Sequence, residues 1–129
     1  MGLQFIDAMI LYAADLKKTV EFYQKLGLPL ETEEHEDGPK HFACELGNAH
    51  IAIYEFSVKN AGGPSKALPK GTSGASQLGL RVESVDQTFA IAVSLGAKIL
   101  AEPQTVPWGR RAVFEDPDGR PIEINQPTP

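Results

Sequence analysis

The second half of the chain repeats the first at an offset of 69 residues. A repeat at this distance indicates that one supersecondary unit has been duplicated, so that both halves fold alike. With 129 residues, the chain is long enough for one compact domain with a core of its own. The matching pairs are Asp15 and Ser84, Thr19 and Thr88, Leu26 and Leu95, and Gly27 and Gly96.

Each copy reads as a strand, a helix and three further strands. In the first copy, Asp15 is a typical helix N-cap and Gly27 a typical stop, with an apolar stripe at helical spacing between them. In the second copy, Ser84 or Asp86 is the cap and Gly96 the stop. The expected strands are 4–12, 30–34, 41–46 and 50–56 in the first copy, and 77–83, 98–102 and the two arms of a hairpin within 107–126 in the second.

Residues 57–75 are mostly Gly, Pro, Ser, Lys and Ala and show neither helical nor strand periodicity. We interpret them as a linker. The chain is therefore expected to be a single domain over 1–129, with a first module at 1–56 and a second module at 76–129.

Glu123 is the candidate functional residue of the hairpin. Asp116-Pro117-Asp118-Gly119 predicts a tight turn, and alternation in the following strand places Ile122 and Ile124 on one face. Glu123 and Asn125 then share the other face. The simplest explanation is a solvated outer face; the alternative is a carboxylate in a site.

Bulk composition excludes several functions. The net charge of −5 and the pI near 5.1 argue against a nucleic-acid partner, because phosphate binding requires clustered Lys and Arg. No apolar run is long enough to span a membrane, and no basic segment precedes the apolar N-terminus. The single cysteine, Cys44, fits a reducing compartment, so we expect a cytoplasmic protein. A catalytic role for Cys44 is disfavoured, because no activating base is adjacent in sequence.

Several motifs resemble the vicinal oxygen chelate superfamily, which includes glyoxalase I, ring-cleaving dioxygenases and bleomycin-resistance proteins. The resemblance covers nearly the whole chain. It implies an α+β fold in which tandem βαβββ modules form two curved mixed sheets around a cleft. The motifs that carry it are Asp15-Leu16, Phe22-Tyr23, Leu26-Gly27-Leu28, Pro107-Trp108-Gly109, and Phe114 to Gly119 followed by Ile122-Glu123-Ile124.

The resemblance also implies where a metal would bind. Metal-dependent members place His, Glu or Gln ligands at the positions of Ala8, Ala52, Gln77 and Glu123. The two alanines have no donor atom, and two oxygen ligands are too few for a selective site. No cofactor is therefore expected; the alternative is a divalent metal ion on Gln77 and Glu123. His41 and His50 remain possible displaced ligands, although strand-end histidines are more often solvated or hydrogen-bonded, and His35 is expected at the surface.

Without a metal, the expected cleft still has aromatic surface and a few placed polar groups, as in small-molecule sites. Trp108 is expected in a loop at its mouth, where it stacks on a ligand or anchors the loop. Arg110 and Arg111 alternate, so one should face the cleft, where it binds a ligand or pairs with Glu123. The candidate ligand-binding residues are Tyr12, Tyr54, Gln77, Arg81, Trp108, Arg111 and Glu123.

Three functions fit these residues. The first is metal-independent binding of a small aromatic or cationic molecule. The second is a lyase, isomerase or dioxygenase that uses Glu123 as base or ligand and Gln77 as polariser, with metal held through His41 or His50. The third is a structural module that binds nothing. The resemblance further implies a homodimer. The sequence leaves open the ligand, and whether the modules pair within one chain or between two.

Overall fold

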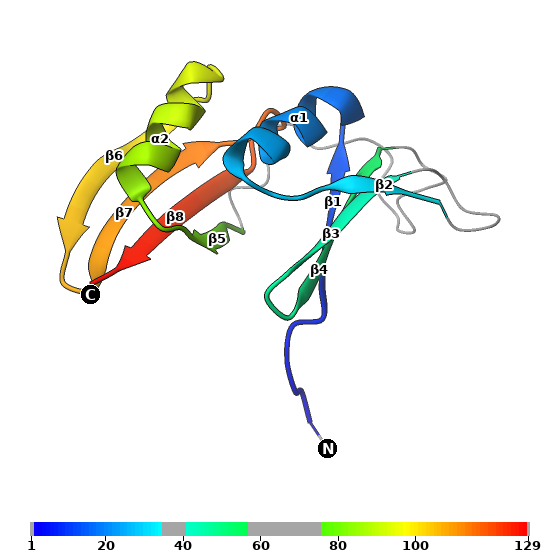
Figure 1. The fold of residues 1–129 in the computed structure, drawn as a ribbon, viewed down its shortest axis with the longest axis horizontal. Coiled ribbons are helices and arrows are strands. Elements are labelled where there is room, and N and C mark those ends of the chain that lie inside the picture. The colour runs from blue at the N-terminus through cyan, green and yellow to red at the C-terminus, as the bar shows by residue number, and fades with distance from the viewer. Residues whose placement is uncertain (1, 35–40, 57–75, 129) are drawn as a thin grey trace. The chain divides into compact units, whose positions relative to one another are not determined.

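The computed structural model describes residues 2–34, 41–56 and 76–128 (Figure 1). The chain divides into two compact units, Met1–Leu68 and Pro69–Pro129. Among the described residues, each unit has four strands and one helix in the same order, as the repeat predicts. The expected linker at 57–75 and the turn at 37–39 lie outside the described residues.

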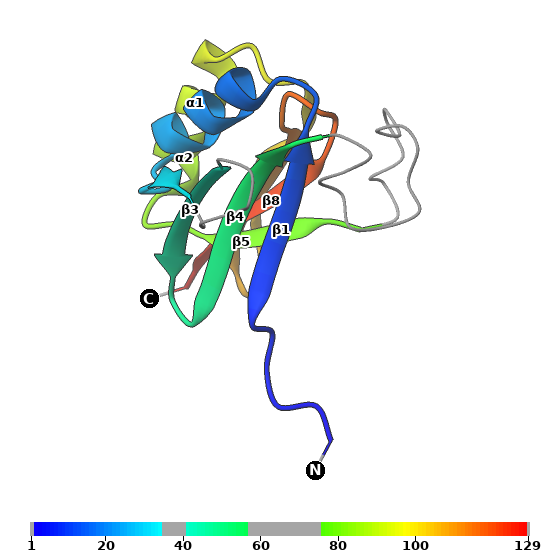
Figure 2. The same cartoon turned by 90° about the vertical axis from the view of Figure 1, so that its right-hand side faces the viewer.

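The first unit forms a mixed sheet covered by one helix. Its strand order is β1-β4-β3-β2; β1 runs parallel to β4, whereas the other neighbours are antiparallel. Figure 2 shows β1, β4 and β3 side by side. The elements are β1 (Ala8–Ala13), α1 (Leu16–Leu26), β2 (Glu31–Glu33), β3 (His41–Leu46) and β4 (Ala49–Glu55).

The second unit repeats this topology with the order β5-β8-β7-β6, and β5 runs parallel to β8. The predicted α+β fold with two mixed sheets is thereby confirmed. The elements are β5 (Leu78–Arg81), α2 (Val85–Ser94), β6 (Ile99–Val106), β7 (Gly109–Glu115) and β8 (Pro121–Pro127).

The two helices begin and end where their capping residues predict. The Asp15 carboxylate accepts a hydrogen bond from the Lys18 amide at 3.0 Å, and the Ser84 hydroxyl accepts one from the Gln87 amide at 3.1 Å. Gly27 follows α1 in the left-handed region with φ 117°, a conformation that favours glycine.

Each sheet buries one face under its helix. In the second unit Ile122, Ile124, Ala112 and Phe114 are fully buried. Side chains of the same parity reach α2: Gln126 Oε1 accepts from the Val85 amide, and Arg110 binds Asp86. In the first unit the buried face contains Leu11, Ala13, Ile51 and Ile53, with Val20, Phe22 and Tyr23 on α1.

The start of β1 and the end of β6 differ most from the sequence prediction. A strand was expected over 4–12, but β1 begins at Ala8, because β4 offers no backbone partner beyond the hydrogen bond from His50 N to Asp7 O. Leu3, Phe5 and Ile6 are left exposed. The strand expected at 98–102 runs instead from Ile99 to Val106, with register shifts against β7 along its length.

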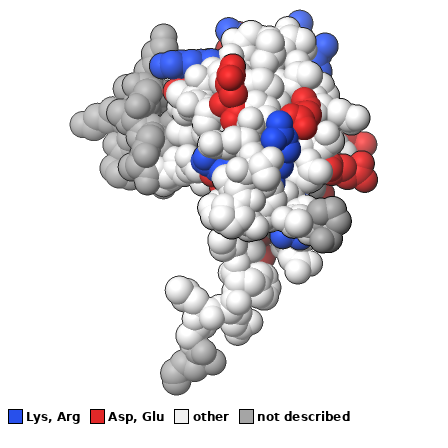
Figure 3. Space-filling model, turned by 90° about the vertical axis from the view of Figure 1, so that its left-hand side faces the viewer, with Lys and Arg blue, Asp and Glu red and all other residues white. Residues whose placement is uncertain are grey.

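Within the described ranges, no helix is both long and apolar enough to cross a membrane. On the face that Figure 3 shows, the described basic and acidic side chains are interspersed, and those of one sign do not gather into a continuous patch.

Candidate functional site

The helix-free face of the second sheet, the side opposite α2, carries a cluster of polar side chains. Glu123 lies opposite Gly79, and Asn125 lies between Arg81 on β5 and Arg111 on β7. Register partners point to the same side of a sheet, so these side chains share one face with Gln77, which precedes β5. Strand register therefore brings together four of the predicted ligand-binding residues: Gln77, Arg81, Arg111 and Glu123.

The Glu123 carboxylate is surrounded by N–H donors. Oε1 accepts hydrogen bonds from Arg111 Nε at 3.0 Å and Arg111 Nη2 at 2.6 Å, and Gln77 Nε2 lies 3.5 Å away. Oε2 accepts from Asn125 Nδ2 at 3.0 Å. A carboxylate offers about four lone-pair positions, and four donors are directed at this one. Three of these donors point at Oε1, whereas Oε2 has one partner and keeps a further lone-pair position.

These contacts determine the charge state of Glu123. The hydrogen bond from Asn125, followed by that from Arg111, lowers the pKa of the carboxyl below its ordinary value, against a smaller opposing effect of burial. Glu123 is thus ionised at neutral pH and balanced by Arg111. A carboxylate with a lowered pKa is a weak general base, because proton abstraction is most effective when the pKa lies near the working pH.

The structure distinguishes the two neighbouring arginines. Arg111 points to Glu123, whereas Arg110 lies on the opposite face, where its guanidinium binds Asp86 at 2.9 Å and Thr105 Oγ1 at 3.1 Å. Arg110 thereby joins β7 to the first turn of α2. Only Arg111 belongs to the candidate site.

Asn125 is the residue of this cluster that the sequence did not single out. Alternation places it on the face of Glu123, but an alternating asparagine is usually just solvated. Its Nδ2 binds Glu123, whereas its Oδ1 is buried without a hydrogen-bond partner among the described residues. A buried acceptor without a donor costs about 1–3 kcal/mol. The orientation of the Asn125 amide that allows Nδ2 to bind Glu123 therefore carries an energetic cost at Oδ1.

The first sheet pairs its strands in the same register as the second, but its helix-free face carries different side chains. Ile10 lies opposite Ala52 in the first unit just as Gly79 lies opposite Glu123 in the second. Ala8 and Ala52 therefore occupy the places of Gln77 and Glu123, and neither has a donor atom. Ala8 is exposed at the start of β1, whereas Ala52 is buried.

Aromatic rings run across this first face. Tyr12 and Tyr54 are register partners, and their ring centroids lie 6.0 Å apart. His41 stacks on Tyr54 at 4.2 Å with an interplanar angle of 14°, and Phe56 meets Tyr12 edge-on at 6.5 Å. The two predicted tyrosines thus belong to one aromatic row.

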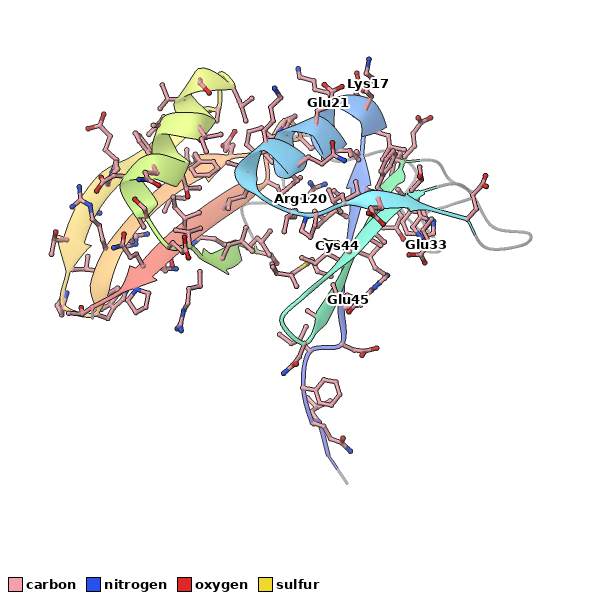
Figure 4. The ribbon with its side chains drawn as sticks, in the orientation of Figure 1. Lys17, Glu21, Glu33, Cys44, Glu45 and Arg120 are labelled. Carbon is pink, nitrogen blue, oxygen red and sulfur yellow. The ribbon has the colours of Figure 1, made fainter. Side chains whose placement is uncertain are left out.

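The two described histidines do not converge. His50 Nδ1 lies 2.5 Å from Glu45, and His41 Nε2 lies 3.6 Å from Glu33. Glu33 and Glu45 are labelled on β2 and β3 in Figure 4. Because Glu45 is four residues from His41 along β3, the two pairs are separated by about 13 Å at ~3.3 Å per residue.

His41 is also buried and faces Glu33, so of the two expected settings, solvated or hydrogen-bonded, it is the paired one that the structure shows. In the described part of the chain, no group of three or more His, Cys, Asp or Glu side chains is placed to hold a metal ion. The third histidine, His35, lies outside the described residues.

Two further residues lie apart from these faces: Trp108, a predicted ligand-binding residue, and Cys44, for which catalysis was disfavoured. Trp108 is 63% exposed at the turn between β6 and β7, and its carbonyl accepts from the Thr128 amide. Cys44 is half-buried, and burial, with a smaller effect of Glu45, raises the pKa of its thiol. A raised pKa reduces the thiolate fraction and hence nucleophilicity.

A groove of about 360 Å³ lies on the helix side of the first unit, and the sequence did not predict it. Val20 and Phe42 give it an apolar lining, while Lys17, Glu21 and Glu55 add charge. Lys17 and Glu21 are labelled on α1 in Figure 4, where they form an exposed ion pair at 4.0 Å. The polar groups of this groove are ordinary surface charges, so the groove offers fewer specific ligand contacts than the helix-free faces.

Two units of identical βαβββ topology define the class of this protein. The sequence model of the glyoxalase/bleomycin resistance protein/dioxygenase superfamily matches residues 5–124. The chain belongs to this superfamily. No curated protein matches the chain.

Solved structures with the same fold include TnmS3, an antibiotic binding protein from Streptomyces sp. CB03234, at 23% identity, a TM-score of 0.70 and 99% coverage of both chains. TioX from Micromonospora sp. ML1 is 21% identical, with a TM-score of 0.68 over 97% of this chain and 100% of TioX. A superfamily member from Sphaerobacter thermophilus DSM 20745 is 19% identical, with a TM-score of 0.71 over 96% and 98% of the two chains.

Proposed function

We propose that this protein binds a small aromatic or cationic molecule without the help of a metal ion, using the helix-free faces of its sheets. The observation that carries the proposal is the first sheet, where Tyr12 and Tyr54 lie side by side on a face that also bears acidic groups. The inter-sheet cleft expected from the sequence stays a prediction.

The charge of this face favours a cation. Glu33 and Glu45 are the register partners of His41 and His50, and Glu31 is the partner of Ala43, so all three glutamates belong to it. Tyrosine rings attract cations through their negative faces, and carboxylates strengthen that attraction. A flat cationic or aromatic ligand would therefore match both the rings and the charge. The description of TnmS3 as an antibiotic binding protein supports a small-molecule role by analogy.

A thermal-shift screen of antibiotics and metabolites, followed by calorimetry on the hits, tests this function. A ligand that binds only the folded state raises its stability with the logarithm of concentration over affinity. Tyr54→Ala should weaken a hit about tenfold or more, since an aromatic pair contributes about 0.5–1.5 kcal/mol beyond the apolar area that it buries. Ile91→Ala, on the exposed side of α2, is the control. Binding unaffected by Tyr12→Ala and Tyr54→Ala would contradict the proposal.

The second candidate is a metal-dependent lyase, isomerase or dioxygenase. The proximity of Gln77 and Glu123, at 3.5 Å, favours it. The donor set does not fit a metal, however, because Arg111 and Asn125 direct N–H groups at the Glu123 oxygens and the equivalent first-unit positions are alanines. Metal analysis of protein purified without chelators separates the two functions: stoichiometric metal that is lost in Glu123→Ala would favour the enzyme.

We further propose that the protein is a homodimer. Leu3, Phe5 and Ile6 are each more than two-thirds exposed, and Ile10 on β1 is half exposed. Adjacent exposed apolar side chains of this size are typical of protein contacts. The cytoplasmic location rests on the sequence alone.

A further inference from the structure

We infer that Arg111 takes the place of a metal ion as the counter-charge of Glu123 and keeps divalent ions away from this carboxylate. The inference deepens the proposed function and rests on its metal independence. It starts from the mismatch between the superfamily's ligand positions and the side chains found around Glu123.

Geometry gives Arg111 this role. Its planar guanidinium directs both Nε and Nη2 at Glu123 Oε1, at 3.0 and 2.6 Å. Charge-assisted hydrogen bonds of this kind are about twice as strong as neutral ones. The two side chains are only 23% and 25% exposed, so solvent screens their attraction less than at an open surface.

The remaining neighbours also direct N–H groups at Glu123. Gln77 Nε2 lies 3.5 Å from Oε1, and Asn125 Nδ2 lies 3.0 Å from Oε2. A metal ion would need the oxygen of Gln77 and a lone pair of Glu123 directed toward it. The Gln77 amide would have to turn and Arg111 would have to leave Oε1, so a divalent ion shared by Gln77 and Glu123 competes with the donors already bound there.

The chain supplies a matched control. Arg110 is the neighbour of Arg111 on β7 and also forms an ion pair, but with Asp86 on the opposite face. Arg111→Met and Arg110→Met remove the same charge from the same strand. Only the first change should open Glu123 to a cation.

The experiment titrates chelator-treated, ¹⁵N-labelled full-length protein with Mn²⁺ up to about 1 mM, a concentration suited to weak oxygen sites. We expect no paramagnetic broadening of the NMR resonances around Glu123 and Gln77 in the wild type or in Arg110→Met. Arg111→Met should show this broadening, with an apparent affinity for Mn²⁺ about tenfold or more above that of the wild type. Adding Glu123→Gln to Arg111→Met should abolish the broadening. Arg111→Lys, which keeps the charge, should still exclude the ion.

Equal broadening in the wild type and Arg111→Met would overturn the inference, as would a folded Arg111→Met without broadening. If Arg111→Lys binds Mn²⁺ as Arg111→Met does, charge replacement is wrong. The Arg111 Nε–H resonance of the wild type gives a reading that requires no variant: it should stay unshifted through the titration, and displacement by Mn²⁺ would contradict the inference. Small-molecule binding by the wild type is measured separately, so failure of the proposed function remains distinguishable.

Discussion

Asp116 and Glu123 both belong to the β7–β8 hairpin and both bind an arginine, yet their settings differ. Asp116 Oδ1 accepts from the amides of Asp118 at 2.8 Å and Arg120 at 3.0 Å, and Oδ2 binds the Arg120 guanidinium. Its side chain has no exposed surface, whereas Glu123 is partly open. Asp116 thus stabilises the turn, whereas Glu123 forms part of the helix-free face of the second sheet.

Replacing Asp116 should be costly. Asp116→Ala removes the acceptor of two turn amides and the nearer of the two carboxylates beside the Arg120 guanidinium, so the free energy of unfolding should fall by about 3 kcal/mol. Asp86→Ala, which breaks the more exposed pair with Arg110, should cost much less, because solvent screens that pair. Chemical denaturation of both variants measures the difference. Equal losses would show that the turn does not depend on the Asp116 carboxylate.

His50 gives stability a dependence on pH. Its hydrogen bond to the Glu45 carboxylate raises the pKa of His50 above its ordinary value. Stability from the charged pair is therefore fully present below about pH 6.5, the unfolded pKa, and is lost as pH rises through the raised folded pKa. Because both side chains are more than a third exposed, solvent screening limits the effect to about 0.5 kcal/mol.

This dependence can be measured with Glu45→Gln. The variant should be less stable than the wild type near pH 5.5 and equally stable near pH 8.5, and NMR titration should show the pKa of His50 falling toward its ordinary value. A stability difference that is constant across this range would contradict the assignment.

Among the strands, β7 is held close to β8 at one glycine. Gly109 has φ 149°, and a Cβ there would lie 2.1 Å from the carbonyl oxygen of Gln126. Gly109→Ala should therefore separate the ends of β7 and β8 and destabilise the protein by about 2–3 kcal/mol.

Gly79, on β5, is the natural comparison. Its φ is not in the left-handed region, and a Cβ at this position would meet no other atom within 4 Å. Gly79→Ala should therefore be neutral or stabilising by up to about 1 kcal/mol. Thermal unfolding of the two variants provides the test. Similar midpoints would mean that the backbone at Gly109 relaxes without cost.

Elements with local signals were predictable from the sequence, and those that depend on a partner were not. Asp15 and Gly27 mark the ends of α1 through bonds within a few residues of themselves, so the sequence was sufficient. The start of β1 depends on how far β4 extends, and the length of β6 depends on register shifts against β7. Apolar periodicity contains neither piece of information.

At the scale of the whole molecule, the repeat predicted both the topology and the shared positions of Ala8, Ala52, Gln77 and Glu123. Alternation left open whether Arg110 or Arg111 joins Glu123, because it does not identify which face is covered by the helix. The stacking of His41 on Tyr54 was missed for a related reason: it joins neighbouring strands at a position that sequence spacing does not specify.

The proposed homodimer leads to a prediction about the N-terminal segment. Replacing Leu3, Phe5 and Ile6 together by serine should shift the protein toward monomer, because it removes the most exposed apolar side chains preceding β1. Light scattering coupled to size exclusion measures the mass directly. The exposed charge change Lys17→Gln on α1 serves as control. A dimer mass retained by the triple variant would exclude this segment as the contact.

The shared register of the two sheets also bears on how such a protein can evolve. A donor side chain introduced at Ala8, which is open to solvent, would require no rearrangement, whereas one at Ala52 would have to displace packed neighbours. New polar chemistry can therefore enter the helix-free face of the first sheet by a single substitution at the start of β1, but not at the middle of β4.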